Sequence, residues 1–280
     1  ENDYAAKKID VWGISDKNLF LESNRVLKQQ TKPFFAVIQT ADNHRPYSIP
    51  AEDKNEFKLL TYSADSLKRF GFESNEEMNA FRYTDFSYQK FMEAAKKEPY
   101  FKNTIFVFVG DHGIRYNGSL EYFPKSWTEQ GLTCEHVPLL FYAPALLKPQ
   151  RVHNVCSQID ILPSIASLAK IPYMNNSLGR NLFDTVAYAQ VLGHDEIIPR
   201  LPKYTAFVID HDLHTIGIVN NQYYYLKNLK TGKDDLVSSI GNNPVKESAE
   251  TDSVKNYLQQ LTDAYYETSK YLLLNNKKRK

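Results

Sequence analysis

The chain has 280 residues, and its 34 Lys and Arg against 33 Asp and Glu leave a formal charge of +1. Its 42% hydrophobic and 24% charged residues are typical of a globular protein, which excludes disordered, collagen-like and coiled-coil chains. A near-neutral chain lacks the concentrated basic face that nucleic-acid binding usually requires, so no nucleic-acid partner is expected. No uninterrupted apolar run reaches the roughly eighteen residues that would span a bilayer.

The small number of cysteines and the absence of four common motifs argue against several kinds of site and enzyme. Cys134 and Cys156 are the only cysteines, too few for a disulfide framework and not arranged as a CxxC pair, so a thiolate zinc site is not expected. Whether the two form one disulfide is left open. The chain also lacks the GxSxG, GxxxxGK, HExxH and GxGxxG motifs. These absences argue against a serine hydrolase, a kinase and a dinucleotide enzyme.

The N-terminal third shows helical spacing followed by a strand-like run. Apolar residues at helical spacing predict a helix over 16–30, with Ser15 or Asp16 as its N-cap. The aromatic and β-branched run over 34–40 predicts a buried parallel strand. The polar segment 41–47 should then form a loop at the carboxyl end of that strand.

The middle of the chain repeats this order. Apolar positions at helical spacing predict a helix over 75–97, and short apolar runs predict buried strands over 104–109 and 137–142. A short apolar helix is expected over 157–168, with Pro163 in its first turn. Alternating strands and helices are typical of a parallel sheet covered by helices on both faces, so we expect an α/β fold built on a mostly parallel sheet.

The pattern changes near residue 200. Three short β-prone runs separated by turn residues predict a small antiparallel sheet, with strands over 204–209, 215–219 and 222–226. An apolar stripe over 253–274 predicts a terminal amphipathic helix. The expected organisation is therefore a main α/β part over 1–200 and a smaller sheet-and-helix part over 201–280.

The segment Gly110-Asp111-His112-Gly113 directly follows a predicted buried strand. Ligands of open α/β sheets gather beyond the carboxyl ends of the strands. Asp111 and His112 supply a hard oxygen and an imidazole nitrogen, which suit a divalent cation, and the flanking glycines permit close approach. The alternative is a helix cap with a structurally bonded histidine, and the local pattern alone leaves both open.

Four other residues are candidate substrate contacts. Asn43 and His44 also follow a predicted strand, and His44 could donate to an anionic oxygen or to a leaving group. His136 lies just before the third strand, and Arg115 could clamp an anionic oxygen. Each has a structural alternative, such as a loop histidine that bonds its own turn. The remaining histidines lack matching partners; they are His153, His194, His211 and His214.

Taken together, seven segments resemble the sulfatase and alkaline-phosphatase superfamily in order and spacing. In chain order they are 12–16 (WGISD), 40–47 (TADNHRPY), 83–85 (YTD), 103–113 (NTIFVFVGDHG), 136–144 (HVPLLFYAP), 157–164 (SQIDILPS) and 179–183 (GRNLF). The first segment and the Asn-His-x-Pro-Tyr loop resemble the lipoteichoic acid synthase and phosphoglycerol transferase branch. The resemblance implies an alkaline-phosphatase-like fold.

The resemblance also implies a site. In this superfamily a threonine, or a formylglycine made from cysteine in true sulfatases, attacks phosphorus or sulfur beside a divalent metal. Carried over, Asp111 and His112 become ligands of one metal ion (Mn, alternatively Mg, Zn or Ca), and His44 becomes a substrate contact. His136 is a looser candidate for the substrate pocket. The family places its nucleophile before the Trp-Gly element, so we expect the nucleophile upstream of Glu1 and no catalytic nucleophile in this chain.

The implied activity is transfer of a phosphoglycerol or phosphoethanolamine group from a phospholipid to a glycolipid or glycan, or hydrolysis if water is the acceptor. The expected partners are a phospholipid or glycan that carries a phosphate or sulfate ester and the upstream half of the catalytic domain. Two alternatives stay open: a sulfatase with an upstream formylglycine, and a non-catalytic binding domain. The resemblance implies a location on the extracytoplasmic face of a bacterial cytoplasmic membrane, anchored by upstream helices.

Overall fold

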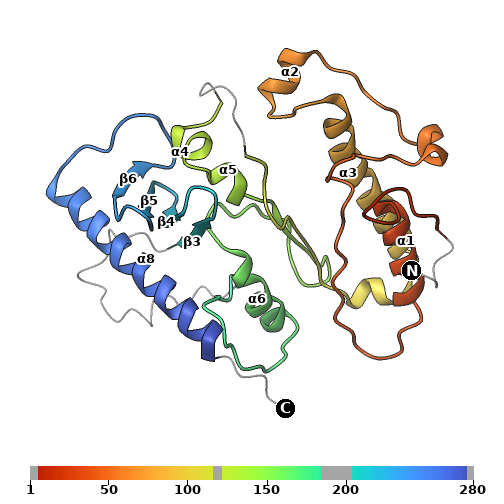
Figure 1. Ribbon diagram of the computed structural model, residues 1–280. Coiled ribbons are helices and arrows are strands. Elements are labelled where there is room, and N and C mark those ends of the chain that lie inside the picture. Colours follow the sequence, from red (N-terminus) through yellow and green to blue (C-terminus); the bar gives the residue numbers. More distant parts are fainter. Residues whose placement is uncertain (1–5, 116–121, 184–203, 276–280) are drawn as a thin grey trace. The chain divides into compact units, whose positions relative to one another are not determined.

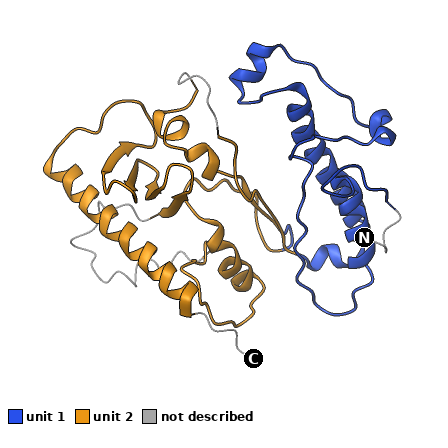
Figure 2. Cartoon of the chain, viewed as in Figure 1, with its two compact units in different colours: residues 1–104, 143–145 blue, residues 105–142, 146–280 orange. Residues whose placement is uncertain are grey.

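A computed structural model of the protein describes residues 6–115, 122–183 and 204–275 (Figure 1). The chain forms two compact units, one of residues 1–104 and 143–145 and the other of residues 105–142 and 146–280 (Figure 2). The domain boundary predicted near residue 200 lies outside the described residues and stays a prediction; His194 also lies outside them. No helix of the described residues is long and apolar enough to cross a membrane.

The first unit is built on two packed helices, α1 (Asp16–Leu27) and α3 (Asn75–Ala95), as the sequence predicts. Ser15 caps α1, because its Oγ accepts a hydrogen bond from a backbone amide of the first turn. Phe20 of α1 packs against two aromatic rings of α3 and is 3% exposed. The shorter helices of this unit are η1 (Ala51–Asn55), α2 (Ala64–Arg69) and η2 (Pro99–Asn103).

The second unit contains two sheets. Strands β1 (Phe106–Val109) and β2 (Leu139–Tyr142) form one pair, and the short helices α4 (Lys125–Thr128) and α5 (Leu132–Glu135) lie between them in the chain. The helices η3 (Gln158–Asp160) and α6 (Ile161–Leu168) follow β2. The predicted meander is confirmed and has a fourth strand; its strands are β3 (Thr205–Asp210), β4 (Thr215–Asn220), β5 (Tyr223–Asn228) and β6 (Asp234–Ser238).

Both faces of the four-stranded sheet are covered. Helix α8 (Ala249–Asn275) runs along one face (Figure 1). There Leu258 and Val254 pack on a row of cross-strand neighbours, Ile218, Tyr225 and Leu236. On the opposite face Leu132 and Trp127, from the α4–α5 segment, pack on residues that include Val208 and Tyr224. The alternation of side chains along each strand thus supplies both cores.

The α/β class, the antiparallel C-terminal sheet and the terminal helix are confirmed, but two details of the expected parallel sheet differ. Residues 34–40 lie outside any strand, and Phe35 and Val37 are 71% and 80% exposed. No described segment pairs with them, and a strand needs a neighbour for its ladder hydrogen bonds. Strands β1 and β2 pair antiparallel, because an apolar run predicts burial without fixing strand direction.

Gly217 shows how tightly the four-stranded sheet is packed. A Cβ at this position would overlap the carbonyl oxygen of Tyr225 and come within 2.8 Å of the Tyr224 ring. Gly217→Ala should therefore lower the free energy of unfolding by about 2 to 3 kcal/mol, measured by urea denaturation. Gly241→Ala is the control, because a Cβ there has Ser238 Oγ as its nearest neighbour at 3.9 Å. Equal stability of the two variants would contradict this description of the sheet.

Candidate active site

The Gly110–Gly113 turn directly follows β1 and exposes its two polar side chains. Asp111 and His112 have side chains that are 69% and 63% exposed. Asp111 Oδ1 accepts a hydrogen bond from the backbone N–H of His112 at 2.9 Å. His112 Nδ1 lies 2.8 Å from the carbonyl oxygen of Gly113, and since a carbonyl only accepts, Nδ1 carries the proton. In a neutral imidazole with this tautomer the lone pair is on Nε2, which lies 4.0 Å from Asp111 Oδ2.

Asp111 and His112 supply donor types that suit a divalent cation. Metal–nitrogen and metal–oxygen bonds to zinc-like ions measure about 2.1 Å, so two donor atoms 4.0 Å apart can both reach one ion, at a donor–metal–donor angle wider than the tetrahedral one. A backbone-bonded Nδ1 that fixes the tautomer is also common for metal-ligating histidines. The described residues contain no group of three or more His, Cys, Asp or Glu that could hold a metal. Asp111 and His112 are therefore two candidate metal ligands, and their binding of a metal stays a prediction.

The two glycines of the turn are required by packing. A Cβ on Gly113 would overlap the carbonyl oxygen of Thr133, and one on Gly110 would lie 2.9 Å from Val137 Cγ1. The turn therefore lies directly against the segment that contains α5 and leads to β2. The amide of Gly113 donates to the carbonyl of Cys134 at 2.6 Å, which holds this end of the turn. Cys134 and Cys156 are both free.

Asn43 and His44 lie in a tight loop of the first unit. The His44 ring stacks on Trp12, with ring centroids 4.6 Å apart, and Trp12 Nε1 donates to the carbonyl of Arg45 at 2.8 Å. Asn43 Oδ1 accepts a hydrogen bond from Thr84 Oγ1 of α3 at 2.9 Å. The Trp-Gly and Asn-His segments of the sequence are therefore in direct contact, and the tryptophan supports the imidazole ring.

A pair of buried carboxylates holds this loop, and the sequence analysis missed it. Asp16 Oδ1 accepts from the backbone amides of Ala41 and Asp42, at 2.8 and 3.3 Å. Asp42 Oδ2 accepts in return from the amide of Asp16 at 2.7 Å. Both carboxylates are at least 94% shielded from solvent, with 1% and 6% exposed. The one signal in the sequence is Asp16, which the helical pattern predicts as a possible N-cap of α1.

This pair predicts a pH-dependent stability. Burial, and then the nearby Asp16 carboxylate, raises the pKa of Asp42 from 3.8 to about 7. An acid with a higher pKa in the folded state binds more protons when folded, so stability should fall as the pH rises from about 4 to about 7. The slope from one proton is at most about 1.4 kcal/mol per pH unit. Asp42→Asn, which keeps an acceptor for the Asp16 amide, should make the free energy of unfolding depend less on pH.

The test is urea unfolding of the unmodified protein and of Asp42→Asn between pH 4 and 8, monitored by circular dichroism. Asp65→Asn, at an exposed position of α2, is the control and should keep the slope of the unmodified protein. An Asp42→Asn variant with an unchanged slope would show that another group titrates.

His136 and Arg115 lie in the second unit with the turn. The His136 ring packs edge-on against Trp127, with centroids 4.9 Å apart, and the resulting desolvation lowers the pKa of the imidazole. Arg115 Nη2 donates to Asp210 Oδ2 of β3 at 2.8 Å and lies 3.6 Å from Asp212 Oδ2. Arg115 is thus bound to an almost fully buried carboxylate, and its contact with substrate stays a prediction.

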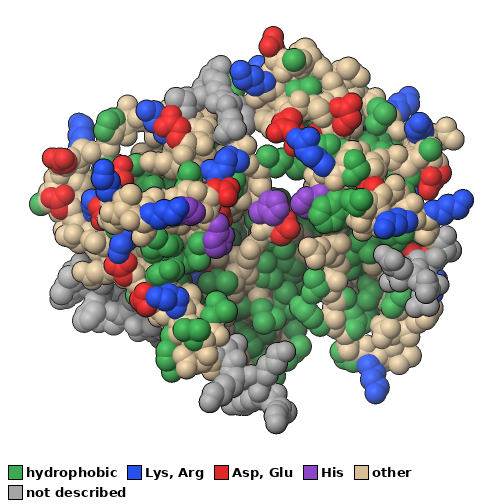
Figure 3. Space-filling view, in the orientation of Figure 1, with side chains coloured by type: hydrophobic (Ala, Val, Ile, Leu, Met, Phe, Trp, Pro, Cys, Tyr) green, Lys and Arg blue, Asp and Glu red, His purple; other side chains and the backbone are tan. Residues whose placement is uncertain are grey.

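The predicted site residues divide between the two units (Figure 2). Asn43 and His44 belong to the first, and the other four, Asp111, His112, Arg115 and His136, belong to the second. The predicted metal pair therefore lies in the same compact unit as Arg115 and His136. That His44 and His112 meet at one edge of a sheet stays a prediction. Histidine side chains reach the surface on the face shown in Figure 3.

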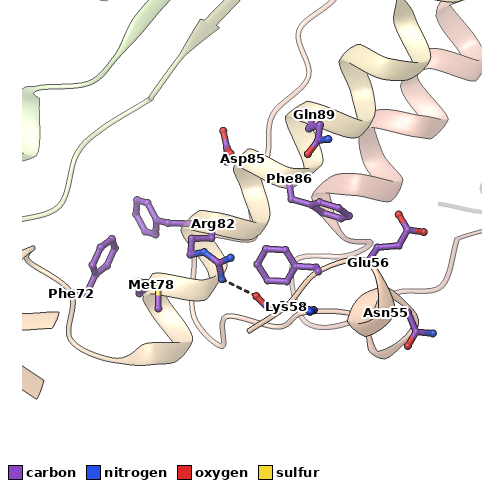
Figure 4. A pocket seen from close by; sticks show the side chains of 11 residues that line it. Asn55, Glu56, Lys58, Phe72, Met78, Arg82, Asp85, Phe86 and Gln89 are labelled. Atoms are coloured by element: carbon purple, nitrogen blue, oxygen red, sulfur yellow. Dashed lines mark hydrogen bonds between the residues drawn. The ribbon is translucent and has the colours of Figure 1, made fainter. Parts of the chain in front are cut away.

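An open depression of about 680 Å³ on the first unit is a poorer candidate (Figure 4). It lies beside α3, and its aromatic walls include Phe57 and Phe86. Arg82, one of its two cationic lining residues, already donates to the carbonyl of Lys58 at 2.9 Å and to Asn79 Oδ1 at 2.8 Å. None of the predicted site residues lines this depression.

Comparison with known proteins agrees with the motifs. The sequence profile of the Sulfatase family matches residues 1–171. The chain belongs to the sulfatase family. Lipoteichoic acid synthase 1 of Bacillus subtilis is 28% identical over 239 residues, which cover 81% of this chain and 35% of that protein. Arylsulfatase K of Gallus gallus is 30% identical over 148 residues, covering 51% of this chain and 26% of that protein.

Solved structures show the same fold for this sulfatase-family chain. The lipoteichoic acid synthase LtaP of Listeria monocytogenes matches with a TM-score of 0.64 at 16% identity, covering 93% of this chain and 60% of that one. The phosphonate monoester hydrolase SpPMH of Silicibacter pomeroyi matches with a TM-score of 0.56 at 14% identity, covering 95% and 65%. The chain thus spans about a quarter to a third of the first-named curated relatives and about 60% of these solved chains.

Proposed function

We propose that the chain forms part of the catalytic domain of a metal-dependent enzyme that transfers or hydrolyses phosphoryl groups. The observation that carries the proposal is the exposed Asp111 and His112 pair, whose donor atoms lie 4.0 Å apart at the end of a strand of a sulfatase fold. The sequence match to lipoteichoic acid synthases over most of the chain supports a substrate with a phosphodiester bond.

In this proposal, Asp111 Oδ2 and His112 Nε2 hold one divalent ion, Mn²⁺ or alternatively Mg²⁺, Zn²⁺ or Ca²⁺. A bound ion of this kind neutralises charge on a transferring phosphoryl group and lowers the pKa of a hydroxyl nucleophile. His44, with Asn43 beside it, contacts a substrate oxygen. His136 and Arg115 are further contacts to the anionic group.

The nucleophile of this proposal is a threonine upstream of Glu1, in the remaining part of the catalytic domain. The partial coverage of the relatives leaves room for such a segment. The acceptor is a glycolipid or glycan hydroxyl in a phosphoglycerol or phosphoethanolamine transferase, and water in a hydrolase. The proposed location is the extracytoplasmic face of a bacterial cytoplasmic membrane, where phospholipid donors and glycan acceptors meet.

The second candidate, sulfate ester hydrolysis through an upstream formylglycine, is favoured by the match to arylsulfatase K. The test compares turnover of bis(p-nitrophenyl) phosphate with that of p-nitrophenyl sulfate, each with Mn²⁺, by the whole protein with any residues encoded upstream of Glu1. Preference for the phosphodiester is expected. Turnover of the sulfate ester alone would support the second candidate, and a protein inactive on both substrates that still binds glycolipid would support a non-catalytic binding domain.

A further inference from the structure

The Gly110–Gly113 turn is held by a side chain far away in the sequence. Gln158 Nε2 donates to the carbonyl oxygen of Gly110 at 2.6 Å and to that of Asp111 at 2.8 Å. The second of these bonds joins residues 47 positions apart. Both hydrogens of one amide are thereby used on two consecutive carbonyls of the turn.

These two bonds act on the backbone on either side of the Asp111 side chain. The carbonyls of Gly110 and Asp111 belong to the peptide planes that precede and follow the Asp111 Cα, so binding both limits rotation there. Exposed side chains gain little positional order from packing, and Asp111 is 69% exposed. The direction of its carboxylate therefore depends on the backbone that Gln158 holds.

The short helix that carries Gln158 is held by an ion pair whose carboxylate is buried. It lies in η3, where the Asp160 side chain accepts from the Ser157 amide at 2.9 Å and completes a capping box. Asp160 is 1% exposed and also binds Arg180, accepting from its Nη2 at 2.9 Å and from its backbone amide at 2.7 Å. Gly179 permits this approach, since a Cβ there would overlap the carbonyl oxygen of Ile159.

Three separate segments of the sequence, the turn included, are thus linked in series. The Gly-Arg segment at 179–180 holds Asp160, and the segment at 157–160 presents Gln158 to the segment at 110–113. We propose that Gln158 is a positioning residue for the metal pair, so that the amide clamp keeps Asp111 and His112 aimed at one ion. This inference rests on the proposed metal site.

The experiment compares Gln158→Met, which keeps the length of the side chain but removes the donor, with Gln150→Met at an exposed position of the same unit. Backbone ¹⁵N relaxation of the metal-free protein reports order in the turn, and calorimetric titration with Mn²⁺ reports affinity. Both use the whole protein, with upstream residues where the gene encodes them. In Gln158→Met the order parameters of residues 110–113 should fall below about 0.6, and Mn²⁺ affinity should fall about 10-fold.

Gln150→Met should match the unmodified protein in both measurements. Unchanged order and unchanged affinity in Gln158→Met, with binding abolished in Asp111→Ala, would overturn the clamp and leave the metal site standing. If the unmodified protein does not bind Mn²⁺, the metal site fails and with it the clamp's role in metal binding. Relaxation then decides only whether Gln158 orders the turn.

Discussion

Asp160→Ala should lower the free energy of unfolding of the second unit by about 3 to 5 kcal/mol, because it leaves the Arg180 guanidinium partly buried without its carboxylate. It also removes the acceptor for the Ser157 and Arg180 amides. Urea denaturation followed by tryptophan fluorescence measures the loss. A Trp12→Phe background leaves Trp127, which packs in the second unit, as the one tryptophan of the chain.

Glu267→Ala is the matched control, since it breaks an ion pair with Lys270 whose side chains are 66% and 50% exposed. Exposed pairs contribute about 0 to 1 kcal/mol, so this variant should unfold close to the unmodified protein. Similar losses in both variants would show that the Asp160 and Arg180 pair does not organise the second unit.

The second large effect concerns activity. Asp111→Ala and His112→Ala should each reduce Mn²⁺-dependent phosphodiester turnover by about 10³-fold, because each removes one of the two proposed ligands and a bound metal supplies several kcal/mol of transition-state stabilisation. Steady-state kinetics of the whole protein measures the loss. Unchanged urea denaturation of both variants should accompany it, since both side chains are exposed.

The control for these variants is His214→Ala, at a turn residue between β3 and β4 that the proposal does not use. It should keep turnover within about threefold of the unmodified protein. A threefold change corresponds to about 0.7 kcal/mol in activation free energy, which is close to the usual size of a surface substitution's effect. If Asp111→Ala kept full Mn²⁺-dependent activity, the Gly110–Gly113 turn would not be the metal site.

Elements with strong periodicity were predictable from the sequence. The helix at 75–95 carries apolar residues at helical spacing behind a serine cap, and these local features decide its limits. The β3–β5 meander was predictable because turn residues separate short β-prone runs. Asp111 and His112 were selected as candidate metal ligands because glycines frame them directly after a strand, and that role stays a prediction.

Features that depend on contacts between distant segments were not predictable in this way. The pairing of β1 with β2 requires knowing which edges meet, and strand direction leaves no mark on a four-residue apolar run. The reciprocal bonds of Asp16 and Asp42 and the Gln158 clamp join residues 25 to 48 positions apart. A polar residue in such a network looks in the sequence like any capping or loop residue.

The central claim is that Asp111 and His112 hold a divalent metal ion. Its most direct test is a crystal of the whole protein soaked in Mn²⁺ and measured at the manganese absorption edge. The account predicts an anomalous peak within about 2.2 Å of both Asp111 Oδ2 and His112 Nε2. A peak bound elsewhere in the protein, with none at the Gly110–Gly113 turn, would contradict it.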